Sequence, residues 1–429
     1  MNSQFSAEGL NSVSSVFDVI VVGAGPGGSN TAAVALRNGL SVAQVEKFKF
    51  PRVKPCAGAL TIKSCNSLQL DLASTLRSEF KEFEFNVWHA RHNRFAHCRS
   101  PILRMVLRPE FDNWLVTQNL KSPRFRFFDE ERVIDVAYDG IFKVRTSKRT
   151  LLGYNLVGAD GAYSAVNRIF KISQPKGYAL AAEVNLSRTT ARVKAEIPPS
   201  FDFGVVEKGY GWVFPKDDHW SVGIYTLKPT KEIRQQLTKY IVDKGFTFEG
   251  DPLETFEAHE FPYGGYRLSI PEIPVYIVGD AGGFGDAITG EGIYHALESG
   301  RIAGEVISRK LAGRQGPALY YKSLRRSVLV DTFLTYQISR EFYRDVNKAL
   351  TILENTLVWR PLVQGYTEGA TFSQSIKKGG WLLVKSFLFR TLRYRRDGLS
   401  LPFSLSGGLR GIRFLTEPLL RRLQSGKTG

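Results

Sequence analysis

The stretch VFDVIVVGAGPGGSNTAAVALRNGLSVAQVEK, residues 16–47, has the pattern of a strand, a glycine turn, a helix and a second strand. Its β-branched run ends at Gly23, which forms the pattern G-x-G-x-x-G with Gly25 and Gly28. Glycines at these places let the backbone approach a pyrophosphate, and the N-terminus of the following helix favours its negative charge. The second strand ends at Glu46, whose carboxylate can bind ribose hydroxyls and would repel a 2′-phosphate. The stretch therefore predicts a dinucleotide site, for FAD or for NAD.

Three later segments repeat a predicted strand followed by a turn and a helix: MVLRPEFDNWLVTQNL (105–120), NLVGADGAYSAVNR (155–168) and VYIVGDAGGFGDAITGEGIYHALESGRIAGE (275–305). In the first segment Arg108 ends the strand and a proline opens the helix. Proline suits this position because the N–H of the first helical residue has no partner within the helix. The second segment contains Asp160-Gly161, and the third contains Gly279-Asp280 before a long helix. This repetition favours an α/β, Rossmann-like fold.

The order and content of these segments resemble the flavoprotein superfamily related to para-hydroxybenzoate hydroxylase. There the second segment is the DG element and the third is the GD element. The resemblance implies that Asp280 contacts the ribityl–pyrophosphate region of FAD and that Arg108 contacts the flavin. It also implies that the helix opening at residues 290–293 faces the flavin ring, where its partial positive charge would stabilise an anionic reduced flavin. The predicted FAD-binding residues are Gly23, Gly25, Pro26, Gly27, Gly28, Glu46, Lys47, Arg108, Asp160, Gly161, Gly279, Asp280, Gly290, Gly292 and Ile293.

Four shorter patterns are similar to the geranylgeranyl reductase family: PRVKPCAGAL (51–60), YGWVFPK (210–216), FPYGGY (261–266) and GDAGGFGDAITGEGIYHALESG (279–300). The resemblance runs from about residue 17 to residue 313. Members use reduced FAD to saturate isolated carbon–carbon double bonds in polyprenyl chains of lipids, quinones or chlorophyll precursors. The family has Cys-Gly-Gly where this chain has Cys56-Ala57-Gly58. Ala57 narrows the backbone angles open to this loop, which predicts a different placement near the flavin.

Cys56 has two interpretations. By residue type alone, a free cysteine is most often a small side chain that permits close packing. In the geranylgeranyl reductase family, which this chain resembles, the matching cysteine borders the substrate tunnel beside the flavin. The resemblance therefore makes Cys56 the candidate catalytic residue. Saturating an isolated double bond requires hydride from the flavin on one carbon and a proton on the other, in a dry pocket. The Cys56 thiol, or an ordered water beside it, would supply that proton.

Residues 177–229 change to short alternating strands, which predict an antiparallel sheet laid over the flavin. The KDD at 216–218 is typical of a hairpin turn between two of them. Core packing is the simpler explanation for any single aromatic side chain here, but together they suit a long apolar ligand. Flavin halogenases carry W-x-W-x-I-P at a comparable place. This chain has Tyr210 in place of the first tryptophan and Phe214 in place of the isoleucine, which makes a halogenase less favoured than a reductase. The predicted substrate pocket comprises Tyr210, Trp212, Phe214, Tyr263 and Gly264.

The predicted organisation is an α/β fold in which an FAD-binding domain and a substrate domain interleave along the chain. The Rossmann-like FAD-binding domain takes residues 16–54, 100–170 and 262–312. An antiparallel-sheet substrate domain takes 55–99 and 171–261, and a C-terminal helical region takes 313–429. Residues 1–15 are predicted to be a disordered lead without the features of a signal peptide.

Positive charge is concentrated at the C-terminal end of the chain. The 58 basic and 41 acidic residues give a net charge of +17, and residues 377–429 alone carry twelve Lys or Arg against two acidic residues. Apolar and basic side chains alternate there at helical spacing, which predicts a helix lying on an anionic membrane surface. A solvated helical pair packed on its own protein is the alternative. No motif that reads nucleic acid is present, so nucleic acid is not an expected partner.

The remaining composition bounds the function. Three cysteines without a CxxC pair or a cysteine–histidine cluster exclude a disulfide framework, predict no metal site and fit a reducing cytoplasm. A second dinucleotide fingerprint is absent, so reduction needs a transient NAD(P)H donor or a ferredoxin-type carrier. The rivals are a flavin-dependent monooxygenase or halogenase, and a prenyl-lipid carrier without flavin that resembles GDP-dissociation inhibitors. The oligomeric state and the prenyl head group are not set by these patterns.

Overall fold

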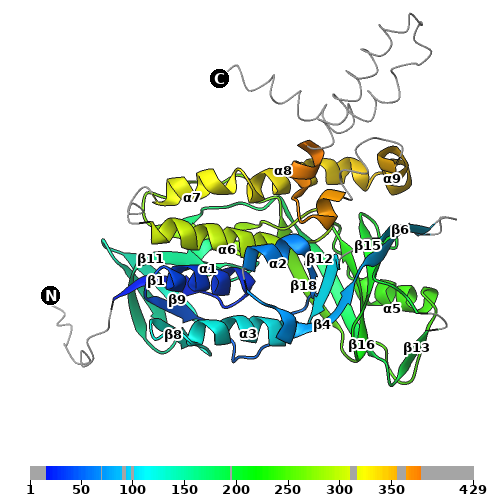
Figure 1. Cartoon of the computed structure of the whole chain (residues 1–429), viewed down its shortest axis with the longest axis horizontal. Coiled ribbons are helices and arrows are strands. Elements are labelled where there is room, and N and C mark those ends of the chain that lie inside the picture. Colours follow the sequence, from blue (N-terminus) through cyan, green and yellow to red (C-terminus); the bar gives the residue numbers. More distant parts are fainter. Residues whose placement is uncertain are drawn as a thin grey trace, which may run out of the picture.

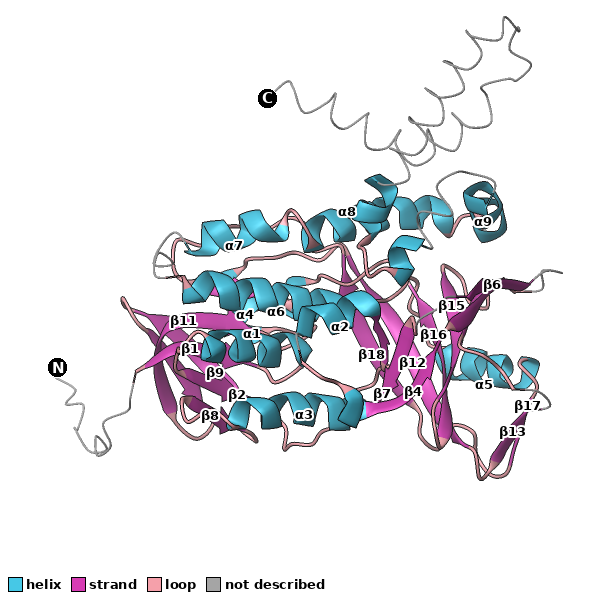
Figure 2. Ribbon diagram, viewed as in Figure 1, coloured by secondary structure: helices cyan, strands magenta, loops and turns pink. Residues whose placement is uncertain are grey.

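The computed structural model describes residues 16–68, 70–88, 93–97, 101–193, 196–309, 316–354 and 364–377. The lead predicted at 1–15 and the basic tail predicted beyond residue 377 lie outside the described residues. Figure 1 and Figure 2 show two sheets that follow one another along the long axis of the molecule, with long helices stacked on the first sheet.

The first sheet contains the strand that precedes the glycine turn. Its strands are β1 (Phe17–Val22), β2 (Val42–Val45), β8 (Phe125–Phe128), β9 (Val133–Tyr138), β10 (Phe142–Thr146), β11 (Thr150–Gly158) and β19 (Val275–Ile277). They are ordered β8-β2-β1-β11-β10-β9, with β19 paired to β11. Strand β1 runs parallel to both of its neighbours, β2 and β11. Val19, Ile20 and Val21 are fully buried, as expected for a β-branched run in a sheet that is covered on both faces.

Helices α1 (Pro26–Arg37), α3 (Arg108–Leu120) and α6 (Ile293–Ser308) pack next to one another beside this sheet. Small residues permit the close approach of α1 and α6, because a Cβ at Gly300 would lie 2.2 Å from the Gly27 carbonyl oxygen. The Asn30 side chain secures the same contact by donating to the Leu297 carbonyl at 2.8 Å. The packing brings the N-termini of α1 and α6 to one cavity.

The second sheet carries the aromatic strands. Its strands are β5 (Glu82–Val87), β6 (Asn93–His97), β12 (Gly177–Ser187), β14 (Ser200–Phe203), β15 (Gly209–Pro215), β16 (His219–Thr226) and β18 (Glu257–Tyr263), in the order β18-β12-β16-β15-β14-β5-β6. Strands β15 and β16 pair antiparallel around the KDD turn, so the predicted hairpin is confirmed. The aromatic side chains Tyr210, Trp212 and Phe214 alternate with small or apolar residues and share one face of β15. Val213 packs on the opposite face, against α5 (Ile233–Asp243).

Smaller elements complete the fold. A three-stranded sheet joins β3 (Ala59–Thr61) and β4 (Leu76–Phe80) to β7 (Leu103–Val106), and β13 (Ala191–Val193) pairs with β17 (Phe246–Phe248). The other helices are α2 (Ile62–Leu68), α4 (Ala165–Phe170), α7 (Gly316–Leu324), α8 (Val328–Phe342) and α9 (Val346–Glu354), with 3-10 turns η1 (Ala73–Thr75) and η2 (Gly279–Gly282). Helix α7 packs against the hydrophobic core of the first sheet, where the Tyr320 hydroxyl donates to the Ile277 carbonyl at 2.7 Å.

The predicted fold class is confirmed: a Rossmann-like α/β sheet, an antiparallel second sheet and C-terminal helices are all present. The domain boundaries stay predictions, and the three-stranded sheet pairs strands from both sides of the boundary placed at residues 99 and 100. Within the described residues, the helices lack the length and hydropathy that crossing a bilayer requires.

Candidate active site

A cavity of about 1110 Å³ lies where the two sheets meet, and residues from both sheets and from the C-terminal helices line it. Most residues that the sequence singled out are brought together here. The lining includes Gly23, Gly25, Pro26, Gly27, Glu46, Lys47, Cys56, Arg108, Asp160, Gly161, Tyr210, Trp212, Phe214, Gly279, Asp280, Gly290, Gly292 and Ile293.

Three predicted site residues lie away from the cavity. Gly28 packs behind the glycine turn, where a Cβ would lie 2.2 Å from the Gly23 carbonyl oxygen. Tyr263 ends β18, and its ring packs on Gly177 and lies 6.2 Å from the ring of Tyr336. Gly264 follows in the left-handed conformation, with φ of 73°. Tyr263 and Gly264 are therefore not among the residues that line the cavity, although Tyr263 packs against the aromatic cluster that contains Tyr210.

The cavity has a polar part, formed by the glycine turn at 23–28, Glu46, Arg52, Arg108 and the segment 279–293. Helix α1 starts there with Gly25 as its N-cap and has no side-chain cap, so its first-turn N–H groups are open to a ligand. Gly23 adopts φ of 101°, and a Cβ there would lie 2.2 Å from the Ala159 carbonyl oxygen. Only glycine fits this turn.

Arg52 completes the anion site of the polar part. Its side chain is 10% exposed, with Nη2 3.1 Å from Asp112 and 3.7 Å from the position of a Cβ at Gly25. Its Nη1 is buried without a hydrogen-bond partner among the described residues. An unpaired guanidinium nitrogen beside an uncapped helix start is the arrangement that binds phosphate oxygens. The residues present thus fit the diphosphate of a dinucleotide.

Two of the predicted carboxylates, Glu46 and Asp160, have different surroundings. Glu46 is 5% exposed and accepts from the Ala24 and Phe48 N–H groups at 3.0 and 3.1 Å, which orients it at the end of β2. Asp160 accepts from Ser164 Oγ at 2.5 Å and from the Ala165 N–H at 2.7 Å, so it caps the start of α4. Burial raises the pKa of Asp160, against the effect of these hydrogen bonds. Glu46 can thus serve a ligand directly, whereas Asp160 mainly orders the turn.

The start of α6 forms the far wall of the polar part. Gly292 is its N-cap, without a side-chain cap, so the first-turn N–H groups point to the cavity. Asp286 holds the preceding loop by accepting from the Ile288 and Thr289 N–H groups, both at 2.7 Å. The Tyr210 hydroxyl donates to the Thr289 carbonyl, which ties this loop to the second sheet. The helix dipole therefore points its positive end at the cavity from a rigid support.

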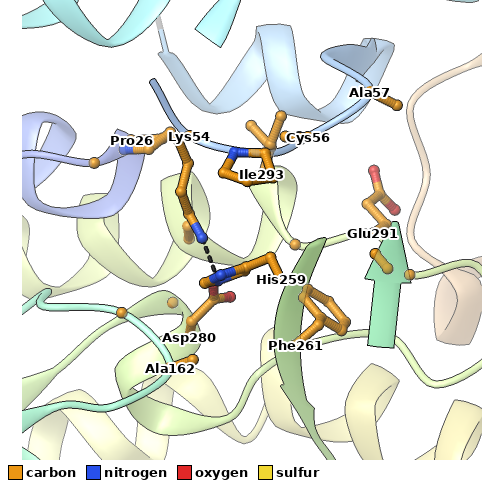
Figure 3. A pocket seen from close by; sticks show the side chains of 18 of the residues that line it. Pro26, Lys54, Cys56, Ala57, Ala162, His259, Phe261, Asp280, Glu291 and Ile293 are labelled. Atoms are coloured by element: carbon orange, nitrogen blue, oxygen red, sulfur yellow. Dashed lines mark hydrogen bonds between the residues drawn. The ribbon is translucent and has the colours of Figure 1, made fainter. Parts of the chain in front are cut away.

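A half-buried pair of basic side chains, Lys54 and His259, lies beside Asp280 (Figure 3). Lys54 Nζ contacts His259 Nε2, and Asp280 acts on Lys54 electrostatically. Burial lowers the pKa of Lys54 to about 8, although Asp280 opposes the shift. Burial and the neighbouring Lys54 lower the pKa of His259 to about 3, so the imidazole is neutral at physiological pH.

Cys56 stands between the two chemical environments of the cavity. On one side, the guanidinium of Arg108 interacts electrostatically with the thiol and makes a paired hydrogen bond with Asp112, at 3.0 and 2.8 Å. Burial disfavours the charge of Arg108, but Asp112 and Cys56 outweigh it and hold its pKa above the ordinary value. On the other side, Ala57 packs against the cluster that contains Tyr210. The left-handed angle of this loop falls on Gly58, with φ of 69°, so Ala57 needs no strained conformation.

The cavity also has an apolar part, formed by the second sheet and the C-terminal helices. Its lining side chains are Phe83, Phe85, Phe201, Phe203, Tyr210, Trp212, Phe214, Tyr225, Ile338, Phe342, Ala349, Leu350 and Tyr366. Ile338 and Phe342 belong to α8, and Ala349 and Leu350 belong to α9, so the predicted helical region contributes to the site itself. Such a surface excludes water and suits a long hydrocarbon.

Sequence reasoning missed two residues of the site as functional residues. Arg52 appeared only within the pattern PRVKPCAGAL, although it lies shortly after the strand-turn-helix-strand unit predicted to bind phosphate. Glu183 was not noted at all, yet it is a single acidic residue within the apolar strand GYALAAEVNL. A lone carboxylate in a buried strand needs a specific partner, which is the signal that would have found it.

The fold and cavity define a dinucleotide-dependent enzyme whose cofactor site opens into a large apolar chamber. A family model described as FAD binding domain matches residues 16–281, so the chain belongs to that family. It is an FAD-dependent oxidoreductase of the para-hydroxybenzoate hydroxylase-like superfamily, and the predicted kinship with geranylgeranyl reductases is confirmed.

Relatives in sequence include proteins named as reductases. An uncharacterized protein of Methanosarcina barkeri is 33% identical over 84% of this chain and 93% of its own length. Geranylgeranyl diphosphate reductase of Nicotiana tabacum is 28% identical over 67% of this chain and 65% of its own length. Menaquinone reductase of Mycobacterium tuberculosis is 27% identical over 75% and 86%.

Solved structures share the fold. A geranylgeranyl bacteriochlorophyll reductase-like protein of Thermoplasma acidophilum has a TM-score of 0.69 at 20% identity, covering 85% of this chain and 95% of that one. A flavin-dependent brominase has a TM-score of 0.67 at 18% identity, covering 89% and 99%. These likenesses concern the fold, which reductases and halogenases have in common.

Proposed function

We propose that this protein saturates isolated carbon–carbon double bonds of a polyprenyl lipid, quinone or diphosphate. The observation that carries the proposal is the position of Cys56 where the polar, FAD-binding part of the cavity meets the apolar part. The names of the reductase relatives support the same class of reaction.

Bound, reduced FAD would supply a hydride to one carbon of the double bond. The glycine turn and Arg52 would hold its diphosphate, Glu46 its ribose, and the start of α6 would face the flavin ring. Cys56, or a water beside it, donates the proton that the second carbon needs, and the adjacent Arg108 stabilises the negative charge left on sulfur.

The apolar part binds the hydrocarbon and keeps the reaction dry. Each buried methylene contributes about 0.8 kcal/mol, so a few isoprene units would be held without any polar anchor. Water exclusion also strengthens every charge interaction in the adjoining polar part. The polyprenyl chain is therefore recognised by length and shape.

The reductant is proposed to be a nicotinamide nucleotide or a ferredoxin-type carrier that docks transiently. The basic tail at 377–429 is proposed to hold the enzyme at the cytoplasmic face of an anionic membrane, where polyprenyl substrates reside. Cosedimentation of the full chain with vesicles of anionic lipid, and its absence with zwitterionic vesicles, would support this placement. Equal binding to both vesicles would contradict it.

The test of the reaction uses the FAD-loaded protein, reduced with dithionite under anaerobic conditions. It is incubated with prenyl diphosphates, prenyl quinones and prenyl glycerol ethers, and the products are weighed by mass spectrometry. Hydride plus proton adds about two mass units for each saturated bond. No mass gain on any substrate, together with oxygen consumption on an aromatic substrate, would favour a monooxygenase or halogenase. A purified protein that cannot be loaded with flavin would favour a prenyl-lipid carrier.

Replacing the thiol tests the role of Cys56. In C56A we expect FAD to stay bound and turnover to fall about 100-fold, because general acid catalysis contributes on that order. C65A is the matched control, since Cys65 is also a half-buried free cysteine but lies beside Arg104 outside the cavity lining. Unchanged turnover in C56A with FAD retained would exclude the thiol as proton donor.

A further inference from the structure

Glu183 is a buried carboxylate in the middle of β12, in a strand that is otherwise apolar around it. It is 8% exposed and lines the cavity. Burial raises the pKa of Glu183, and the ammonium of Lys216 opposes the shift. Burial in turn lowers the pKa of Lys216, with Glu183 opposing. A carboxylate in such a place destabilises the fold unless its hydrogen bonds compensate for the lost water.

Both oxygens of Glu183 have defined partners. Oε1 accepts from the backbone N–H of Cys56 at 2.5 Å, across 127 residues of sequence. Oε2 accepts from Ser221 Oγ at 3.2 Å. Ser221 in turn accepts from the indole Nε1 of Trp212 at 3.2 Å. A continuous chain of hydrogen bonds thus runs from the aromatic wall of the apolar part, through two strands, to the backbone of the Cys56 loop.

The Cys56 loop contacts the second sheet through Glu183, at the Cys56 amide, and through the contact between Lys54 and His259. Its neighbour Gly58 is fixed on the opposite side, because Val106 N–H donates to the Gly58 carbonyl at 2.9 Å and a Cβ at Gly58 would collide with the Val106 carbonyl. The loop is therefore held between β7 on one side and Glu183 on the other. Loss of the Glu183 contact frees the side of the loop that carries the thiol.

We propose that Glu183 is the positioning residue of Cys56. Its carboxylate fixes the loop by accepting a hydrogen bond from the Cys56 amide. Ser221 and Trp212 connect this restraint to the aromatic wall of the apolar part, which the hydrocarbon touches. The role of this hold in proton donation rests on the proposed function. The restraint on the Cys56 loop can be measured from the reactivity of the thiol, without any prenyl substrate.

The first experiment measures how fast Cys56 reacts with N-ethylmaleimide in the FAD-loaded protein, read at the Cys56 peptide by mass spectrometry. In E183M the amide loses its acceptor and becomes an unsatisfied buried donor, so the loop should open and the rate should rise about tenfold. In E183Q the side-chain carbonyl still accepts from the amide, so the rate should stay within about threefold of the unaltered protein. S221A keeps the hydrogen bond from the Cys56 amide to Glu183 but removes the link to Trp212. Its alkylation rate should therefore lie between those of E183M and E183Q.

Glu257 provides the matched control, since it is the cross-strand neighbour of Glu183 on β18 and belongs to neither of these hydrogen bonds. E257M should react at the rate of the unaltered protein. An E183M rate equal to that of E257M would overturn the proposal, as would an E183Q rate as high as that of E183M. If E183M does not retain FAD, the decision passes to S221A, whose rate must exceed that of E257M.

The second experiment separates this inference from the proposed function. With a substrate that the protein saturates, E183M should lower kcat about tenfold and leave KM nearly unchanged, because the hydrocarbon-binding wall remains, and E183Q should restore most of kcat. A rise in KM with constant kcat would contradict a positioning role. If no substrate is saturated but the alkylation rates follow the expected order, the proposed function fails and the hold on Cys56 stands.

Discussion

The polar and the apolar parts of the cavity are built in opposite ways. The polar part consists largely of backbone groups in short, contiguous turns, such as the glycine turn at 23–28 and the start of α6. The apolar part is assembled from side chains of the second sheet and of helices α8 and α9, and two of these, Phe83 and Leu350, are 267 residues apart in sequence. A cofactor common to many enzymes is bound by local geometry, whereas the substrate surface depends on how distant segments pack. Substitutions in the two parts should therefore fail in different ways.

The largest effect should follow from a single methyl group in the glycine turn. In G23A the new Cβ would meet the Ala159 carbonyl oxygen at 2.2 Å, so the turn must move and FAD binding should be lost by more than about 100-fold. The ratio of flavin to protein absorbance in the purified variant measures this. G39A is the control, because Gly39 also has a positive φ, of 81°, but has no atom within 4 Å. If both variants kept FAD, the tight turn would not matter for binding.

The next effect concerns the anion site. R52M removes the guanidinium whose Nη1 lacks a partner among the described residues. Charge-assisted hydrogen bonds contribute about 1.5–3 kcal/mol, so we expect FAD to bind about 30-fold more weakly and with less dependence on salt. Titration of the apoprotein with FAD, followed by flavin fluorescence, gives the dissociation constant. R104M, which removes an arginine paired with Glu79 outside the cavity lining, should leave it unchanged. Wild-type affinity in R52M would refute this assignment.

A change in the apolar part should leave the affinity for FAD unchanged. In F214A a ring that lies 5.1 Å from the Phe201 ring is removed from the wall. We expect FAD affinity to stay the same and the KM for a polyprenyl substrate to rise about tenfold, because the lost ring contacts the hydrocarbon in ground state and transition state alike. A loss of FAD in F214A, confirmed for a folded protein by circular dichroism, would show that the two parts are not separable.

The smallest effect is a pH dependence of stability that originates in the polar part. Lys54 is protonated in the unfolded chain up to about pH 10.5 but in the folded apoprotein only up to about pH 8. Between these values unfolding takes up a proton, so this group makes the free energy of unfolding rise with pH, by at most about 1.4 kcal/mol per pH unit. K54M should remove this rise, which denaturant titrations of the two apoproteins at pH 8 and above will measure. Parallel pH profiles in both proteins would show that Lys54 is not desolvated.

Several parts of the site were predictable because they depend on local chemistry. Gly23 and Gly25 were found from glycine spacing, since only particular turns place backbone N–H groups around an anion. The start of α6 was found from the resemblance to the flavoprotein superfamily. Asp160 was also placed at the cavity, but its role as the cap of α4 depends on Ser164 and the turn geometry. Tyr263 and Gly264 were assigned to the pocket by pattern alone, and neither is among the residues that line the cavity.

The sequence by itself determined the α/β class, the dinucleotide-binding turn and the hairpin of β15 and β16, because each depends on residue order over a few positions. The choice of FAD and the candidate cysteine came from the resemblance to known families. Tertiary structure alone decided which aromatic residues line the chamber, that Arg52 keeps a nitrogen available for an anion, and that Glu183 reaches the Cys56 amide. These features join residues that are distant in the chain. Their contacts arise only when the two sheets pack, and no local pattern encodes that packing.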